Sequence, residues 1–258
     1  MAAKLKTLAE QVIVLTGASS GIGLCTAQLA AQQGARLVLI ARSTRVLQTL
    51  VNIIGHSGGD AVCIAADVAV REEVLGAART AVGRFGRIDT WVNNAGLSIY
   101  GRLDQISEAD GRRLFDINFW GVVNGSLAAL PHLTGGGALI NVGSELPDGD
   151  LPLQGMYSSS KHAVKGFTDA LRTEVVEVDH APVSITLIQP AAPDVSYPWQ
   201  GRAPMHAAPE LPAPALDPML VAEAILRAAT EGGRDVKVLR SASALTPSAS
   251  GLMPAASA

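Results

Sequence analysis

A tyrosine and a lysine, Tyr157 and Lys161, stand four residues apart in the run Tyr-Ser-Ser-Ser-Lys. Residues at this spacing share one face of a helix, so the two side chains can meet. An isolated tyrosine has a pKa of about 10, and a neighbouring ammonium favours the phenolate and lowers that pKa. The pair can therefore act as a proton donor and acceptor near neutral pH. An amphipathic helix without chemistry is the alternative, because Ala163, Phe167 and Leu171 supply an apolar face.

A serine, Ser144, follows the apolar run Ala138–Val142, which has the length of a strand. Open α/β sheets bind ligands at the carboxyl ends of their strands, and a hydroxyl there can donate to a substrate oxygen. A loop serine bonded to its own backbone is the alternative. A serine nucleophile is disfavoured, because no Gly-x-Ser-x-Gly elbow surrounds Ser144 and none of His132, His162 and His180 fits a triad pattern.

A glycine-rich turn, Thr16-Gly17-Ala18-Ser19-Ser20-Gly21-Ile22-Gly23, follows the apolar run Val12–Leu15 and opens a helical stretch. Glycines let a backbone approach a pyrophosphate, and a helix N-terminus supplies N–H donors. The spacing Gly-x-x-x-Gly-x-Gly differs from the fingerprint Gly-x-Gly-x-x-Gly, and an ordinary tight turn is the alternative. The residues of the turn predicted to bind a dinucleotide are Gly17, Ser19, Ser20, Gly21, Ile22 and Gly23.

Apolar runs of strand length alternate with helical stretches along the chain, which is typical of a parallel sheet covered on both faces. We predict strands at Val12–Leu15, Leu37–Ile40, Ala61–Ala65, Thr90–Val92, Ala138–Val142, Val183–Ile188 and Asp235–Leu239. We predict helices at Leu24–Gln33, Arg45–Ile54 and Pro218–Thr230, the last with Asp217 as N-cap. The fold class is therefore α/β, a doubly wound, mostly parallel Rossmann sheet with helices on both faces, in a single domain over residues 1–240.

Prolines forbid regular structure over most of the span between Pro190 and Pro218. A long loop in a compact domain is either an active-site lid or disordered, and we predict a substrate loop over residues 191–217. Within it, the side chains that could line an apolar pocket are Tyr197, Trp199 and Met205. Residues 241–258, rich in Ser, Ala and Pro, are expected to form a flexible C-terminal tail.

The composition excludes several classes of protein. The chain has 258 residues, 48% of them hydrophobic, and a net charge of −3 without a basic block, which argues against a disordered tail and against nucleic-acid binding. Cys25 and Cys63 lie far apart in no metal-like spacing, so we expect no metal site and a reduced, cytoplasmic protein. Two stretches poor in charge, Gln11–Ala35 and Ile117–Ser144, are broken by polar residues, so no membrane span is expected.

Taken together, these motifs resemble those of the short-chain dehydrogenase/reductase family. The glycine turn matches that family's cofactor motif Thr-Gly-x-x-x-Gly-x-Gly, and Asn93-Asn94-Ala95-Gly96 matches its Asn-Asn-Ala-Gly. Tyr157 and Lys161 match its Tyr-x-x-x-Lys, with Ser144 at the usual interval before the tyrosine. Asn118, in a helix expected to start near Asp110, falls where the family keeps a fourth catalytic residue. The matches follow the family's order over residues 8–240.

The resemblance implies a role for each of these residues. Tyr157 would be the general acid/base, and Lys161 would bind the nicotinamide ribose while lowering the pKa of Tyr157. Ser144 would orient the carbonyl or alcohol, and Asn118 would hold a water in the proton relay; for Asn118, a helical residue bonded to local backbone is the alternative. The further residues that the resemblance places at the cofactor are Asp67 and Val68 at the adenine, where a simple turn aspartate is the alternative, and Asn94, Ala95, Gly96 and Pro190.

Cofactor choice is predicted from the end of the second strand. A site for NAD places an acidic residue roughly 20 residues after the glycine loop. Here Ala41 stands at that place with Arg42 beside it, and an arginine fork suits a phosphate. This favours NADP, with Ser19 and Ser43 as helpers and NAD as the second choice. A solvated surface arginine is the alternative.

The sequence departs from the family after its sixth strand. Pro190 is kept, but Ala191 replaces a glycine and Val195 replaces a threonine that holds the nicotinamide carboxamide in many members. Ser196, displaced by one residue, could substitute. The departure concerns carboxamide anchoring and leaves all four predicted catalytic residues in place.

The resemblance predicts an oxidoreductase that interconverts an alcohol and a ketone or aldehyde, and Arg42 makes NADP(H) the expected cofactor. The charge and hydropathy patterns predict neither nucleic acid nor membrane as partner. A dinucleotide-binding sensor or scaffold with little turnover is the first alternative, suggested by Ala191 and Val195, and a serine hydrolase the second. Many relatives form dimers or tetramers through the helices that correspond here to Asp110–Leu130 and Tyr157–Val176. We therefore expect a homodimer or homotetramer.

Overall fold

The structure is a computed structural model that describes residues 3, 5–133, 135–145, 153–191 and 216–239. Its centre is one seven-stranded sheet in the order β3-β2-β1-β4-β5-β6-β7, with every neighbouring pair parallel. The strands are β1 (Val12–Thr16), β2 (Arg36–Ala41), β3 (Ala61–Ala65), β4 (Thr90–Asn93), β5 (Gly137–Val142), β6 (Val183–Pro190) and β7 (Asp235–Val238). All seven predicted strands form, and the predicted doubly wound α/β class is confirmed.

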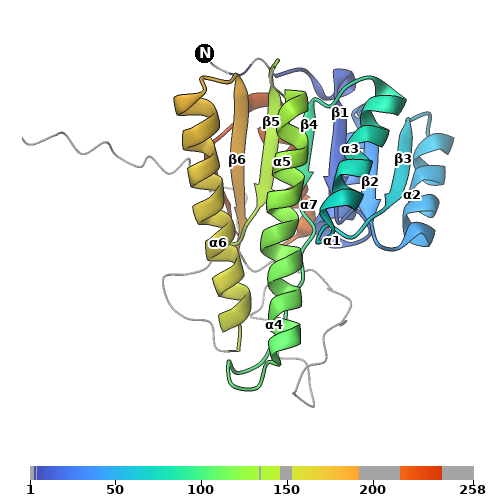
Figure 1. Ribbon diagram of the computed structural model, residues 1–258. Coiled ribbons are helices and arrows are strands. Elements are labelled where there is room, and N and C mark those ends of the chain that lie inside the picture. The colour runs from blue at the N-terminus through green and yellow to red at the C-terminus, as the bar shows by residue number, and fades with distance from the viewer. Residues whose placement is uncertain (1–2, 4, 134, 146–152, 192–215, 240–258) are drawn as a thin grey trace, which may run out of the picture.

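Helices cover both faces of this sheet (Figure 1). They are α1 (Gly21–Gln32), α2 (Thr44–His56), α3 (Arg71–Phe85), α4 (Glu108–Phe115), α5 (Gly121–Leu133), α6 (Gly155–Arg172) and α7 (Pro218–Glu231). In α7 the predicted N-cap is confirmed, because the Asp217 carboxylate accepts a hydrogen bond of 2.9 Å from the Met219 N–H. The sequence analysis did not single out α3, which ends at Gly86 with a left-handed φ of 77°.

The two helices expected over Asp110–Leu130 and Tyr157–Val176 both form, and each contains a π-helical turn that was not predicted. The first consists of α4, a π-helical turn at Asp116–Trp120 and then α5. The second is α6 followed by a π-helical turn at Thr173–Val178. A π-helical turn inside an α-helix shifts the side-chain register locally, and such turns are frequent at functional sites. The first of these turns contains Asn118.

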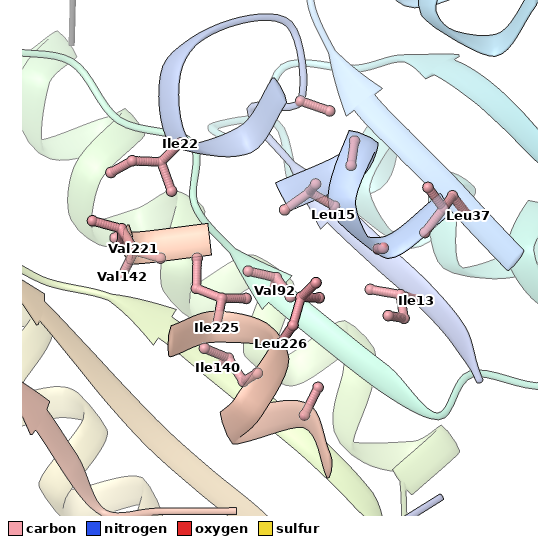
Figure 2. Close-up of a cluster of buried hydrophobic side chains, with 14 of the residues drawn as sticks. Ile13, Leu15, Ile22, Leu37, Val92, Ile140, Val142, Val221, Ile225 and Leu226 are labelled. Atoms are coloured by element: carbon pink, nitrogen blue, oxygen red, sulfur yellow. The ribbon is translucent and has the colours of Figure 1, made fainter. Parts of the chain in front are cut away.

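Two apolar clusters hold the helices onto the sheet. One packs β1, β2, β4 and β5 against α1 and α7, and Figure 2 shows Ile13, Leu15, Ile22, Val221 and Ile225 in it. The other lies on the opposite face, beneath α3, α5 and α6, and contains Trp91. All five residues of β1 are buried, which is what a strand covered on both faces requires.

Both cysteines are free thiols and partly buried, and desolvation by burial raises the pKa of Cys25 above its ordinary value. Within the described residues no cluster of His, Cys, Asp and Glu could hold a metal ion. No helix in that part of the chain is both long and apolar enough to cross a membrane. The predicted division into a domain over residues 1–240, a substrate loop over 191–217 and a tail over 241–258 stays a prediction, because residues 192–215 and 240–258 lie outside the described part.

Candidate active site

The glycine turn connects the carboxyl end of β1 to the start of α1, and it needs glycine for steric reasons. Gly17 has a left-handed φ of 68°, and a Cβ there would lie 2.7 Å from the Cα of Ala95. A Cβ on Gly23 would lie 2.1 Å from the carbonyl oxygen of Gly17. The turn therefore folds tightly on itself and against the loop that follows β4 (residues 94–98).

Thr16 and Asn94 join the turn to this loop. The Thr16 hydroxyl accepts hydrogen bonds from the N–H groups of Asn94 at 2.9 Å and Ala95 at 3.1 Å. The Asn94 amide donates in return to the carbonyl oxygens of Thr16 at 3.0 Å and Gly17 at 3.2 Å. Asn94 and Ala95 were predicted as cofactor residues, whereas Thr16, the first residue of the glycine motif, was given no role of its own because its contacts depend on the loop after β4.

The residues of the turn fit the pyrophosphate of a dinucleotide. Ser20 occupies the N-cap position of α1 in extended conformation, and its hydroxyl makes no capping hydrogen bond to the helix. The first N–H groups of a helix have no partner within the helix, so an uncapped N-terminus offers its donors and dipole to an anion.

Helix α6 presents Lys161 and Tyr157 on one face, as predicted. The Lys161 side chain is buried, and its Nζ donates a hydrogen bond of 3.0 Å to the carbonyl oxygen of Val142, the last residue of β5. Nζ lies 5.8 Å from the centre of the Tyr157 ring. Desolvation by burial lowers the pKa of Lys161 to about 8. An ammonium has three N–H donors, and the Val142 carbonyl accepts only one hydrogen bond from Lys161. The other donors could therefore bind ribose hydroxyls.

Ser144 lies two residues beyond this acceptor, at the carboxyl edge of β5. Its neighbours continue the pairing with β6, because the Gly143 N–H donates to the Ile188 carbonyl at 2.7 Å and the Glu145 N–H donates to the Pro190 carbonyl at 2.9 Å. The Glu145 carboxylate accepts a hydrogen bond of 3.0 Å from Lys237 Nζ on β7. The predicted site residues Ser144 and Pro190 therefore lie on one stretch of paired backbone.

Asn118 is fully buried in the π-helical turn, and its side-chain amide holds the surroundings of the site together. Its Oδ1 accepts from the Leu97 N–H at 2.7 Å, and its Nδ2 donates to the Leu97 carbonyl at 2.8 Å. The same Nδ2 lies 3.0 Å from Ser160 Oγ, which donates to the backbone carbonyl of Tyr157 at 2.7 Å. The amide thus positions the loop after Gly96 and the first turn of α6, while its role toward a water stays a prediction.

A network of buried polar side chains joins β4, β5 and α6, and the sequence analysis did not predict it. Asn93 Nδ2 donates to Asn141 Oδ1 at 2.9 Å, and Asn141 Nδ2 donates to Thr168 Oγ1 at 2.9 Å. Trp91 Nε1 donates to Asn93 Oδ1 at 2.8 Å. The chain of contacts ties β4 and β5 to α6. Buried polar groups that satisfy one another in this way fix a single arrangement of the elements that carry them.

The residues predicted for the adenosine end lie at the ends of β2 and β3. Ala41 ends β2, and Arg42 follows with an exposed side chain. Burial raises the pKa of the Asp67 carboxyl, but the hydrogen bond from the Ala69 N–H and the charges of Arg113 and Arg42 outweigh it, so that its pKa lies below the ordinary value. The structure thus brings Arg42 and Asp67 together at one edge of the sheet.

The proline-rich segment was predicted to cover the site. Ala191 is described, and its N–H donates to the Val238 carbonyl at 2.9 Å. Val195, which replaces the family's anchoring threonine, and Ser196, its proposed substitute, lie outside the described residues. The side chains expected to line an apolar pocket lie there too; they are Tyr197, Trp199 and Met205.

The protein has the features of a dinucleotide-binding α/β protein. These are a doubly wound parallel sheet, a glycine turn that leads into an uncapped helix after the first strand, and a buried lysine beside a tyrosine. A family model described as short chain dehydrogenase matches residues 11–200. The chain belongs to the short-chain dehydrogenase/reductase family, as the resemblance predicted. The family is one of oxidoreductases, which argues against a serine hydrolase at Ser144.

Individual proteins agree with this assignment. The uncharacterized oxidoreductase YxnA of Bacillus subtilis (strain 168) is 44% identical over 250 residues, which cover 94% of this chain and 69% of that protein. A short chain dehydrogenase/reductase from Burkholderia phymatum in complex with NAD is 25% identical, with a TM-score of 0.78 over 88% of each chain. A metagenomic short-chain oxidoreductase in complex with NADP is 25% identical, with a TM-score of 0.75 over 90% of this chain and 98% of that chain.

Proposed function

We propose that the protein is an NADP(H)-dependent oxidoreductase that interconverts an alcohol and a ketone or aldehyde. The observation that carries this proposal is the buried Lys161 ammonium, held by Val142 at the carboxyl edge of β5 with the Tyr157 ring 5.8 Å from its Nζ. Ser144 follows the same strand edge. A buried cation at a strand edge costs desolvation energy, and a role in binding and proton transfer accounts for that cost.

NADP(H), when bound, supplies or accepts the hydride. The chain's residues then handle the proton and the orientation of the substrate. In the direction of reduction, Tyr157 donates its hydroxyl proton to the carbonyl oxygen, and the neighbouring positive charge of Lys161 stabilises the phenolate that forms. Lys161 also donates to the ribose hydroxyls. Ser144 donates a hydrogen bond to the same substrate oxygen, on which negative charge develops.

Arg42 supports NADP over NAD. It stands where β2 ends, next to Ala41 at the place where an NAD site has an acidic residue. The solved relatives do not separate the two cofactors, because one is a complex with NAD and another a complex with NADP. The preference is therefore proposed from Arg42 itself, whose planar fork suits a phosphate.

The free thiols of Cys25 and Cys63 support a cytoplasmic location.

The test is a panel of ketones, aldehydes and alcohols, assayed with NADPH and NADH in parallel, together with titration of each cofactor by nicotinamide fluorescence. We expect turnover of some carbonyl compounds with NADPH in preference to NADH. Tight binding of the cofactor without turnover across a broad panel would instead support the sensor or scaffold. Failure to bind either cofactor would refute both proposals.

A further inference from the structure

Asp67 lies between two arginines at the adenosine end of the proposed cofactor site. Arg113, from the last turn of α4, forms an ion pair with Asp67 in which its Nη2 donates to Oδ2. The other carboxylate oxygen, Oδ1, accepts from the Ala69 N–H at 3.0 Å. Arg42 is close enough for its charge to act on the same carboxylate. A negative group and two positive groups therefore share one small region at the ends of β2 and β3.

The segment that carries Arg113 also fixes the turn that carries Asp67. Asn124 Nδ2 on α5 donates to the Val68 carbonyl at 2.9 Å. Gly121 packs so closely that a Cβ there would lie 2.7 Å from Val68 Cγ2. The ion pair is thus one of several contacts from the segment 108–133 to the Asp67–Val68 turn. Removal of the Arg113 charge alone leaves the other contacts in place.

The Asp67 charge conflicts with the proposed choice of cofactor. A 2′-phosphate bound at Arg42 would bring a second anion toward the Asp67 carboxylate, and like charges at short range repel. The Asp67 side chain is 25% exposed and the Arg113 side chain 38%, so solvent screens this repulsion only in part. A surface ion pair of this kind adds little to folding stability, so its main effect is on the local potential.

We propose that Arg113 determines cofactor specificity: its ion pair with Asp67 offsets a negative charge that would otherwise oppose a 2′-phosphate held at Arg42. The inference rests on the proposed use of NADP(H) and adds a second arginine to it. Arg113 acts through Asp67, and it is a positioning residue rather than a phosphate ligand. NADH lacks the 2′-phosphate, so its affinity depends much less on Arg113.

The test measures dissociation constants for NADPH and NADH by nicotinamide fluorescence in four variants and the wild type. In Arg113→Met the NADPH-to-NADH affinity ratio falls roughly fivefold, because the Asp67 charge is no longer paired. In Asp67→Asn the ratio does not fall. In the double variant Asp67→Asn/Arg113→Met the ratio stays near that of Asp67→Asn, because no carboxylate remains for Arg113 to offset.

Arg112→Met is the matched control. Arg112 is the neighbouring residue on α4, and it forms an ion pair with Glu108 in which both side chains are at least three-quarters exposed. We expect Arg112→Met to leave the ratio unchanged. Thermal unfolding of each variant shows whether the fold is intact.

Three results overturn the inference. An equal loss of affinity for both cofactors in Arg113→Met would show a structural role, and unchanged affinities for both would show no role. A ratio that falls as much in the double variant as in Arg113→Met would show that Arg113 contacts the phosphate directly. A wild type that prefers NADH or binds neither cofactor would refute the proposed NADP(H) dependence, and that failure is distinct because it requires no variant.

Discussion

At the scale of single residues, the four residues predicted to be catalytic differ in burial and in the hydrogen bonds that anchor their side chains. Lys161 and Asn118 are buried and anchored, Lys161 to the Val142 carbonyl and Asn118 to Leu97 and Ser160. Tyr157 and Ser144 are half-buried, so both remain partly accessible to solvent. We therefore expect the buried pair to position the proposed site and the more accessible pair to contact the substrate.

Replacing Tyr157 by phenylalanine removes the titrating proton and keeps the ring. We expect Tyr157→Phe to lower kcat by about 10²- to 10⁴-fold while cofactor affinity stays near that of the wild type. We expect Lys161→Ala to lower both kcat and cofactor affinity, because the same ammonium is proposed to lower the pKa of Tyr157 and to bind the ribose. Steady-state kinetics on a substrate from the panel, with fluorescence titration of NADPH, measures the two effects separately. A near-native rate in Tyr157→Phe would show that the catalytic assignment is wrong.

Burial of Lys161 predicts how stability depends on pH. Its pKa is lowered from the ordinary value of 10.5 to about 8, so between these values the unfolded chain holds a proton that the folded chain has lost. The free energy of unfolding therefore rises with pH across this window. Denaturant unfolding at several pH values should show a shallower rise in Lys161→Met than in the wild type. Equal slopes in both proteins would contradict a lowered pKa.

Arg42 gives the choice of cofactor a direct test. Arg42→Ala should weaken NADPH by roughly ten- to hundredfold, as expected for loss of a charge-assisted hydrogen bond, and leave NADH nearly unchanged. Ala41→Asp should reverse the preference, because a carboxylate repels the phosphate and accepts from the ribose 2′-hydroxyl. The wild-type preference should shrink with added salt. Equal loss of both cofactors in Arg42→Ala would mean that the residue is structural.

Element scale. The seven strands were predictable because each is a short apolar run along the sequence, and Ala61–Ala65 even has the predicted bounds. The π-helical turn at Asp116–Trp120 was not, because its composition does not differ from that of an α-helix. The Asn93–Asn141–Thr168 network was missed for another reason: its members are far apart in sequence, and only the packing of β4, β5 and α6 brings them together.

The residues of the site also divide into those that local sequence predicts and those that only tertiary structure brings together. Glycine spacing and the Tyr-x-x-x-Lys pair are local, so the sequence alone predicted the cofactor turn and the paired side chains of α6. Arg113 reaches Asp67 across 46 positions of the chain, and nothing at either residue indicates the other. Contacts of this kind follow from tertiary structure.

The glycine turn predicts a strong local effect. Gly23→Ala places a Cβ 2.1 Å from the Gly17 carbonyl oxygen, so the turn must open. We expect cofactor affinity to fall by at least about tenfold, since the N–H donors move away from the pyrophosphate. Gly83→Ala on α3 is the control: its Cβ meets nothing within 4 Å, and the protein should be more stable by up to about 1 kcal/mol. Unchanged affinity in Gly23→Ala would rule out this turn as the pyrophosphate site.

Whole-molecule scale. We propose that the protein is a homo-oligomer, as the family resemblance predicted. Two large apolar side chains on the segment 108–133, Trp120 and Leu127, are 52% and 42% exposed. They stand seven residues apart and therefore lie near one face. Light scattering at micromolar concentration should give the mass of a dimer or tetramer, and Trp120→Glu should shift it toward the monomer. A monomer in the wild type would contradict the proposal.

The contact between Glu145 and Lys237 determines when one part of the proposed site can form during synthesis of the chain. The backbone after Ser144 pairs with β6, and its Glu145 side chain bonds to β7, which follows every other strand along the chain. A ribosome synthesises the chain from its N-terminus, so β1 to β5 emerge while this support is still missing. The contact between Lys237 and Glu145 therefore forms late. A prematurely terminated product that ends before Asp235 carries every predicted catalytic residue but lacks the lysine that bonds to Glu145, the residue next to Ser144.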